Sequence, residues 1–426
     1  MTAAGRSLAA CLALLLGACS LIDAQTQQDR IDAFCVFGGE VSSARAEPRP
    51  IVVVLARRAP APARNWQAVD HFVLERPGRW EFFAPAGSEY AIAAFEDVNR
   101  DLAYQRSESY ASVAFDRPLD CSPRSRLDNL SLRLPAKAGK PFPYALDVSA
   151  LHVRSADDQL DRTLGQATAV GDVTTLDDPR FALENAKDSL WRPLDFVIAQ
   201  RPGVYFLQPY DAARVPVLFV HGMLGTPRDL RYLIDRLDRA RFQPWVYYYP
   251  SGARLSVDAE HLNQTVAKLQ QRYHFRRFAL VGYSMGGLVS REFLLRHAAS
   301  ARPDRLPVFV SISSPWGGDS AADLGIKTAP VVVRVWRDMV PGSDFLRTLF
   351  ARPLPPQTKH YLLFTYRRNS ALFGASSDET VTVASQLRPE AQREATYLYG
   401  FDDTHESVLA DPEVSALLNA LLAGAF

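Results

Sequence analysis

The chain has 426 residues, of which 47% are hydrophobic and 22% are charged, and this composition excludes a disordered or fibrous protein. Its 48 Lys and Arg residues balance its 47 Asp and Glu residues, so no broad charge favours binding to nucleic acid or to an acidic surface. The length predicts two or three domains that can bury a sizeable core. No internal stretch reaches the roughly 18 uninterrupted apolar residues that a membrane helix needs.

The first residues predict export. One positive charge at Arg6 precedes an apolar run over 8–16, which is followed at once by Leu-Gly-Ala-Cys ending at Cys19. This order is typical of a secretory signal, and the run is too short to span a bilayer. Leu-Gly-Ala-Cys resembles the lipobox of bacterial lipoproteins. The resemblance implies a lipoprotein signal over 1–19, a lipid on Cys19 as the only membrane anchor, and a place in the bacterial cell envelope, at the outer membrane or facing the periplasm. The alternative is a simple signal peptide with an incidental cysteine.

The cysteine count agrees with export. Cys11 would leave with the signal and Cys19 would carry the lipid, so Cys35 and Cys121 remain as an even pair for an oxidising compartment. We expect a disulfide between them, which would stabilise the fold by roughly 4 kcal/mol in the chain-entropy model. Two buried free thiols are the alternative.

The region 20–148 predicts a small all-β, sandwich-like accessory domain. A polar tether over 20–34 is followed by short apolar stretches between Pro and Gly turns. These stretches are 51–55, 69–74, 80–83, 90–95 and 130–134. Residues 149–212 then carry polar turns and are predicted to be a connector.

The region 213–426 predicts an α/β domain. Apolar runs typical of buried strands alternate with segments of helical periodicity, and this alternation indicates a parallel sheet wrapped by helices. The expected strands are 215–220, 245–249, 278–281, 308–312, 361–365 and 396–399.

A nucleophile motif lies inside this α/β pattern. Gly282-Tyr283-Ser284-Met285-Gly286 fits Gly-x-Ser-x-Gly and stands between an expected strand and an expected helix, as the motif requires. The alternative is a tight turn with an idle serine.

Acyl transfer also needs amide donors for the developing oxyanion. The motif assigns these to the backbone of Met285 and, after His221-Gly222, to that of Met223. His221 ends a strand before a glycine turn, which favours a structural role over that of a base.

Several segments together resemble the lipase and GPI inositol-deacylase-like branch of the α/β-hydrolase superfamily. They are Val217 to Pro227, Tyr248 to Gly252, Val281 to Arg291 and Ser313 to Gly318. Tyr283 departs from the resemblance, since many relatives have His there. The resemblance implies an α/β-hydrolase fold that uses neither a metal nor an organic cofactor.

The family order of nucleophile, acid and base assigns the other two members of the triad. Ser376 to Val381 resembles the acid loop, with Glu379 in place of Gly, so Asp378 is the expected acid and Asp402, Asp403 and Glu379 are its rivals. His405 follows the last expected strand and is the expected base.

An apolar insertion over about 315–356 could cap the site and accept acyl groups, or its residues could simply pack on the sheet.

The prediction is a serine esterase or lipase that cleaves small-molecule or lipid esters through an acyl-enzyme on Ser284. One alternative is an acyltransferase with the same triad. Another is a catalytically idle hydrolase fold that binds an envelope partner, which the sequence leaves unidentified.

Overall fold

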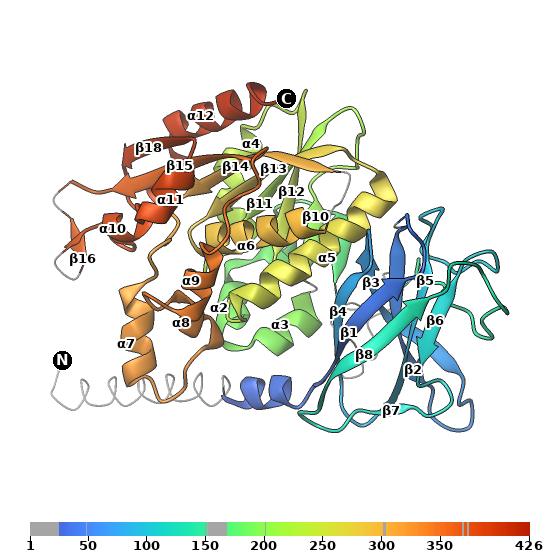
Figure 1. Cartoon of the computed structure of the whole chain (residues 1–426). Helices are drawn as coiled ribbons and strands as arrows, with labels where there is room; N and C mark the ends of the chain where they lie inside the picture. The colour runs from blue at the N-terminus through green and yellow to red at the C-terminus, as the bar shows by residue number, and fades with distance from the viewer. Residues whose placement is uncertain are drawn as a thin grey trace.

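The computed structural model describes residues 25–47, 49–149, 151, 168–200, 202–300, 304–368, 370–372 and 375–426, with the side chains of 371 and 372 excepted. The predicted signal and Cys19 lie outside these ranges. The chain forms an all-β part followed by an α/β part, and helix α5 lies between them (Figure 1). No helix in the described ranges combines the length and apolar character needed to cross a membrane.

Two sheets form the all-β part. Their inward residues share one apolar core, which contains Phe37 and Trp80 from one sheet and Val53 and Ile92 from the other. The short apolar stretches thus predict an all-β region correctly, and we call this pair of sheets around one core the sandwich. The first sheet has the order β4 (Gly78–Ala84), β1 (Cys35–Ser43), β8 (Arg126–Leu134). The second has the order β3 (Trp66–Leu74), β2 (Ile51–Arg58), β5 (Glu89–Glu96), β6 (Tyr110–Val113), with β7 (Leu119–Asp120) also paired to β5.

A disulfide joins Cys35 and Cys121 in the sandwich core. Their Cα atoms are 5.6 Å apart, and both side chains are buried. The bond ties the first residue of β1 to the segment after β7, so it connects the two sheets.

An eight-stranded sheet forms the centre of the α/β part. Neighbouring strands are parallel except for β10 and β12, which are antiparallel. The order is β18 (Tyr397–Asp402), β15 (Lys359–Tyr366), β14 (Arg305–Ile312), β13 (Arg277–Tyr283), β11 (Val215–Val220), β12 (Phe242–Tyr248), β10 (Gly203–Phe206), β9 (Ala169–Val173). Each of the six predicted strands overlaps one of these.

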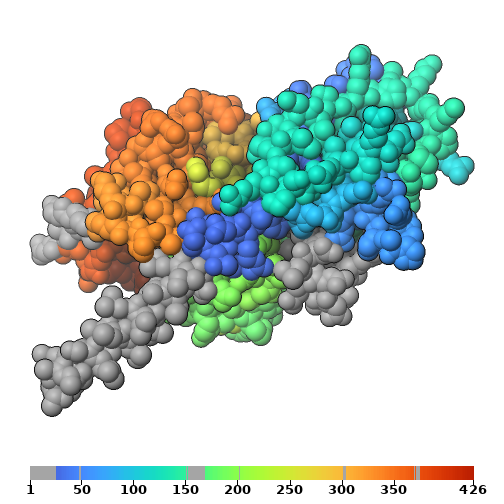
Figure 2. Space-filling model, turned by 90° about the horizontal axis from the view of Figure 1, so that it is seen from below, coloured from blue at the N-terminus to red at the C-terminus, as the bar shows by residue number. Residues whose placement is uncertain are grey.

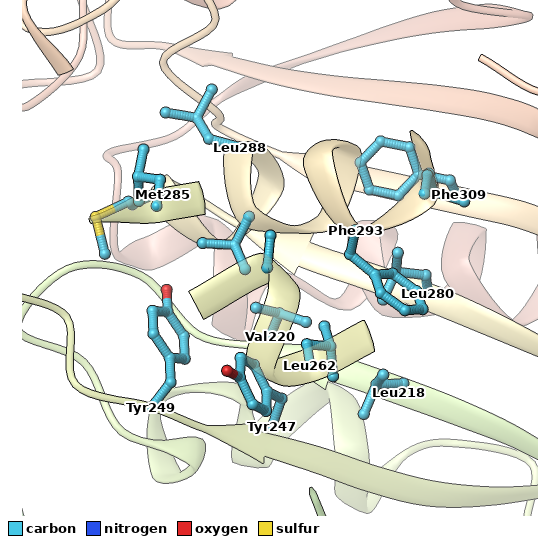
Figure 3. Close-up of a cluster of buried hydrophobic side chains, with 14 of the residues drawn as sticks. Leu218, Val220, Tyr247, Tyr249, Leu262, Leu280, Met285, Leu288, Phe293 and Phe309 are labelled. Atoms are coloured by element: carbon cyan, nitrogen blue, oxygen red, sulfur yellow. The ribbon is translucent and has the colours of Figure 1, made fainter. Parts of the chain in front are cut away.

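Helices cover both faces of this sheet. Alternate residues of β11 enter two separate cores, Leu218 and Val220 on one face and Val217 and Phe219 on the other. The first face carries α5 (Leu255–Tyr273) and α6 (Met285–Ala299), whose side chains form the cluster in Figure 3 together with side chains from the strands beneath. The second carries α4 (Arg231–Asp235) and α12 (Pro412–Ala423). Shorter elements are η1 (Pro179–Phe181), η2 (Pro227–Leu230), α10 (Val383–Gln386), α11 (Pro389–Glu394), η3 (Ser407–Ala410) and the pair β16 (Ala371–Leu372) and β17 (Ala375–Ser376).

The prediction of a connector over 149–212 is wrong. This stretch supplies β9 and β10 at one edge of the central sheet, and helices α2 (Leu183–Trp191) and α3 (Pro193–Gln200). Both strands have five residues or fewer, too short for a periodic signal to separate them from loops. The α/β part therefore begins by Ala169 and not at 213.

The predicted tether is also partly wrong. Residues 25–32 are helical and belong to the blue N-terminal part of Figure 2, and their contacts place this helix against α3 and against the segment before α8 (Arg334–Met339). Arg30 pairs with Asp195 of α3 at 2.9 Å, and Gln28 Nε2 donates to the carbonyl of Val332 at 2.8 Å. Arg334 pairs with Asp32 as well. The helix therefore bridges two regions of the α/β part.

The insertion over about 315–356 forms α7 (Ser320–Thr328), α8 (Arg334–Met339) and α9 (Asp344–Leu349). Most of its large apolar side chains belong to the core beneath, including Val335, Met339, Leu346 and Leu349. Leu324 on α7, by contrast, has 52% of its surface exposed. The observed burial favours packing on the sheet for most of the insertion.

Removing the disulfide should lower the stability of the sandwich. The two cysteines are 86 residues apart, and in the chain-entropy model opening so long a loop costs about 4 kcal/mol of unfolding free energy. Urea unfolding of Cys35→Ala/Cys121→Ala should show this loss, and Cys35→Ala alone should match it. Equal midpoints for the oxidised parent and the double variant would contradict the expectation.

Mild acid should also destabilise the fold through buried histidines. Burial lowers the pKa of His221 and His261 to about 4 and that of His360 to about 3. The rings of the unfolded chain become protonated at pH ~6.5, so the unfolded chain binds more protons than the folded chain as the pH falls toward 4. Stability should fall by about 1.4 kcal/mol per pH unit for each ring over this window.

Urea unfolding at pH 7 and pH 5 measures this loss. His360→Gln removes one of the three rings. It should therefore reduce the dependence of the unfolding free energy on pH by about the contribution of one proton. An unfolding free energy that stays constant between the two pH values would show that the rings do not control stability.

Candidate active site

Ser284 stands on a sharp turn at the middle of the central sheet. Strand β13 ends at Tyr283 and helix α6 begins at Met285, so Ser284 alone makes the change of direction, with φ 52° and ψ −128°. A positive φ strains a residue that has a side chain, and this strain is what the nucleophile elbow motif predicts. The Ser284 amide donates to the carbonyl of Ile312 at 2.8 Å, which fixes the turn to β14.

Glycine at position 286 makes this turn possible. A Cβ atom there would lie 2.4 Å from the carbonyl oxygens of both Val220 and His221, which are backbone atoms that cannot move aside. The missing side chain allows the start of α6 to approach the end of β11. The motif therefore positions Ser284 next to the loop that follows β11.

The three residues of the expected triad lie in hydrogen-bonding contact. His405 Nε2 is 2.9 Å from Ser284 Oγ, and His405 Nδ1 is 2.7 Å from Asp378 Oδ2. The His405 amide also donates to the carbonyl of Asp378 at 2.9 Å. With the proton on Nδ1, Nε2 is free to accept the hydroxyl proton of the serine.

Asp378 is buried and ionised. Burial raises its pKa, but the hydrogen bond and positive charge of His405 and the donors around the carboxylate hold that pKa below its ordinary value. Two of these donors are the amides of Thr380 and Val381, at 3.0 and 2.6 Å from Oδ1. Glu379 has φ 80°, so the residue in place of the usual glycine keeps a glycine-like conformation.

The rival acids point elsewhere. Asp402 lies 3.9 Å from Arg367, Asp403 accepts a hydrogen bond from Ser407, and Glu379 is exposed. Among the described residues, Asp378 is the carboxylate that contacts the His405 ring.

Two backbone amides are available near Ser284 Oγ. Those of Met223 and Met285 make no hydrogen bond to any residue in the described ranges. The next amide, that of Leu224, instead donates to Ser251 Oγ at 3.2 Å. A Cβ added to Gly222 would lie 3.0 Å from Ser284 Cβ, so this loop passes directly beside the nucleophile. The two amides could receive a negative oxygen.

His221 does not act on Ser284 in this structure. Its ring is fully buried, stacks on Tyr249 with centroids 4.3 Å apart, and contacts the Gly222 carbonyl through Nδ1 at 2.8 Å. Burial lowers its pKa to about 4, so the ring is neutral at pH 7. This environment suits a residue that shapes the loop.

Three contacts at the site have no sequence motif that predicts them. Tyr283 donates through its hydroxyl to the carbonyl of His405 at 3.0 Å, so this departure from the family pattern supports the base loop. Thr365 and Gln386 both contact Asp378. They come from β15 and α10, and only the folded chain shows that they meet.

No group of three or more potential metal ligands occurs among the residues that the structure describes.

A match to one protein family agrees with this architecture. Residues 251–389 match a family described as "Alpha/beta hydrolase of unknown function (DUF915)". No curated protein matches the chain. Among solved structures, the mature lipase BlEst2 of Bacillus licheniformis is 18% identical, with 51% of this chain and 97% of that one covered and a TM-score of 0.41.

Two further structures are similar at the same level. The metagenomic carboxyl esterase MGS0156 is 16% identical, covering 53% of this chain and 81% of its own, with a TM-score of 0.39. Lipase B of Aspergillus fumigatus is 16% identical, covering 65% of this chain and 64% of its own, also with a TM-score of 0.39. The central sheet, the turn at Ser284 and the family match together identify the chain as a protein with the α/β-hydrolase fold.

Proposed function

We propose that the protein hydrolyses carboxylic esters through an acyl-enzyme on Ser284. The observation that carries this proposal is the continuous contact from Ser284 Oγ through His405 to Asp378, at 2.9 and 2.7 Å. A serine hydroxyl is a weak nucleophile until an adjacent base takes its proton. The geometry supports His405 as that base and Asp378 as the ionised group that orients it.

The first half of the reaction forms the acyl-enzyme. Ser284 Oγ attacks the ester carbonyl while His405 Nε2 takes the hydroxyl proton, and Asp378 stabilises the resulting imidazolium. The carbonyl oxygen becomes negative and accepts hydrogen bonds from the amides of Met223 and Met285. His405 then returns the proton to the leaving alcohol, and the C–O bond to that alcohol breaks.

The second half releases the acid. His405 takes a proton from water, which attacks the acyl carbonyl, and the bond to Ser284 Oγ breaks as the serine regains its proton. Neither half needs a metal or an organic cofactor.

Apolar side chains on the loop after β11 support an acyl or lipid ester as the substrate. Met223 on this loop is half-buried and Leu224 has 44% of its surface exposed, whereas Met285, Leu288 and Tyr249 are fully buried in the core cluster of Figure 3. Accessible apolar side chains close to a polar reaction centre favour a substrate with a hydrocarbon part.

We also propose that Cys19 carries a lipid that holds the enzyme at the bacterial cell envelope, on the strength of Leu-Gly-Ala-Cys after an apolar run. A single acyl chain binds membranes only marginally, whereas two chains give stable anchoring.

Substitution of the triad should abolish hydrolysis of p-nitrophenyl esters from acetate to palmitate. Asp378→Asn should lower kcat by about 10⁴-fold, since it leaves the wrong His405 tautomer. Ser284→Ala and His405→Ala should lower it at least as much. Asp402→Asn is the matched control and should keep the activity of the parent. A fluorophosphonate probe should label Ser284 in the parent.

Other outcomes of this assay have definite meanings. Product diverted to an added alcohol would favour the acyltransferase. A parent that neither hydrolyses any ester nor reacts with the probe would overturn the proposal in favour of an idle binding fold.

Replacing Cys19 should release the protein from membranes. In a bacterium fed an alkyne-tagged fatty acid, the full chain should take up the tag and sediment with membranes, and Cys19→Ala should do neither. Cys11→Ala should behave like the parent. Equal labelling of parent and Cys19→Ala would refute the anchor.

A further inference from the structure

The Asp378 carboxylate receives two side-chain donors besides His405. Thr365 Oγ1 lies 2.6 Å from Oδ2, and Gln386 Nε2 lies 3.0 Å from the same oxygen. All three side chains are fully buried. A buried carboxylate without such donors would favour its protonated form.

The orientation of Gln386 is fixed by its other contacts. Its Oε1 accepts from the Thr365 amide at 2.8 Å, and its Nε2 also donates to the Thr365 carbonyl at 3.0 Å. Because the oxygen end is held by an N–H donor, the nitrogen end must face Asp378. The side chain therefore clamps the end of β15 to the acid.

Thr365 is oriented in the same way by Ser313. The two hydroxyl oxygens are 2.8 Å apart. An ionised carboxylate only accepts hydrogen bonds, so the Thr365 hydrogen points to Asp378 and the Ser313 hydroxyl donates to Thr365. Ser313 directly follows Ile312, whose carbonyl accepts from the Ser284 amide. These two hydroxyl groups therefore connect the acid to the end of β14, where Ile312 accepts the hydrogen bond of the Ser284 amide.

We propose that Thr365 and Gln386 are positioning residues that hold Asp378 ionised and directed at His405 Nδ1. This inference rests on the proposed ester hydrolysis. Hydrogen bonds to a charged acceptor are about twice as strong as neutral ones, so two of them on one oxygen oppose the effect of burial. Their loss raises the pKa of Asp378 and releases its orientation, and His405 then loses the tautomer that leaves Nε2 free.

The test measures kcat, KM and the pH profile of Thr365→Val and Gln386→Met on a p-nitrophenyl ester. Each should lower kcat about 10-fold or more at unchanged KM, because one strong donor to the acid is lost. The acidic limb of the kcat/KM profile should move to higher pH. Thr365→Ser keeps the hydroxyl and should restore both the rate and the profile.

Thr358→Val is the matched control. Thr358 lies just before the same strand and donates its hydroxyl to the carbonyl of Leu306 at 2.7 Å, remote from the acid. It should leave kcat and the pH profile unchanged, even if it lowers the melting temperature.

Three results would overturn the inference. One is a parent-like pH profile in both Thr365→Val and Gln386→Met. The second is an equal loss of rate in Thr365→Val and Thr365→Ser. The third is a loss of rate in Thr358→Val as large as that in Thr365→Val. Failure of the proposed function itself is a different result, since the parent would then show neither hydrolysis nor fluorophosphonate labelling of Ser284.

Discussion

The close approach of α6 to β11 is the constraint on which the rest of the site depends. The space for a side chain at Gly286 is occupied by the carbonyls of Val220 and His221, so the turn at Ser284 requires glycine there. This contact brings the loop after β11 beside the nucleophile and leaves the Met285 amide at the open start of α6. The proposed nucleophile and the proposed oxyanion donors therefore both depend on one packing contact.

The order of the central strands brings the other residues of the site together. β14, β15 and β18 follow β13 across the sheet and run parallel to it, so their carboxyl ends meet at one edge. Ser284, Ser313, Thr365 and His405 each lie at or just after one of these ends, and the acid loop follows β15. Because the carboxylate and imidazole are both buried, their attraction is screened little by water, and a small set of hydrogen bonds controls which form each adopts.

The sequence predicts the parts of this site that carry a local signal. Ser284 has flanking glycines at a strand end, and Asp378 and His405 follow predicted strands in the family order. Thr365 and Gln386 could not be predicted in the same way, because a Thr in a strand and a Gln on a short helix have no distinguishing pattern. Their role depends on contacts that form only when β15 and α10 pack together.

The same distinction, between a local sequence signal and contacts formed on folding, explains which elements of the fold the sequence predicts. Long apolar runs such as 215–220 predict strands correctly, because burial on both faces leaves a continuous signal. β9 and β10 are not predicted because they are too short to give such a signal. The helix over 25–32 is not predicted because contacts with the rest of the protein determine its stability. Only Gln27 on it is buried, and its contacts to α3 and to Val332 and Arg334 are polar. An isolated helix of eight residues is marginal in water, so these tertiary contacts account for it.

The sandwich depends on the α/β part in a comparable way. β3 and β4 are both edge strands of their sheets, and exposed edges invite pairing with other chains. Helix α5 covers the β3 edge, where Gln264 accepts a hydrogen bond from the Val73 amide at 3.2 Å. The sandwich is therefore joined to the α/β part through α5, and its β3 edge is covered within the same chain.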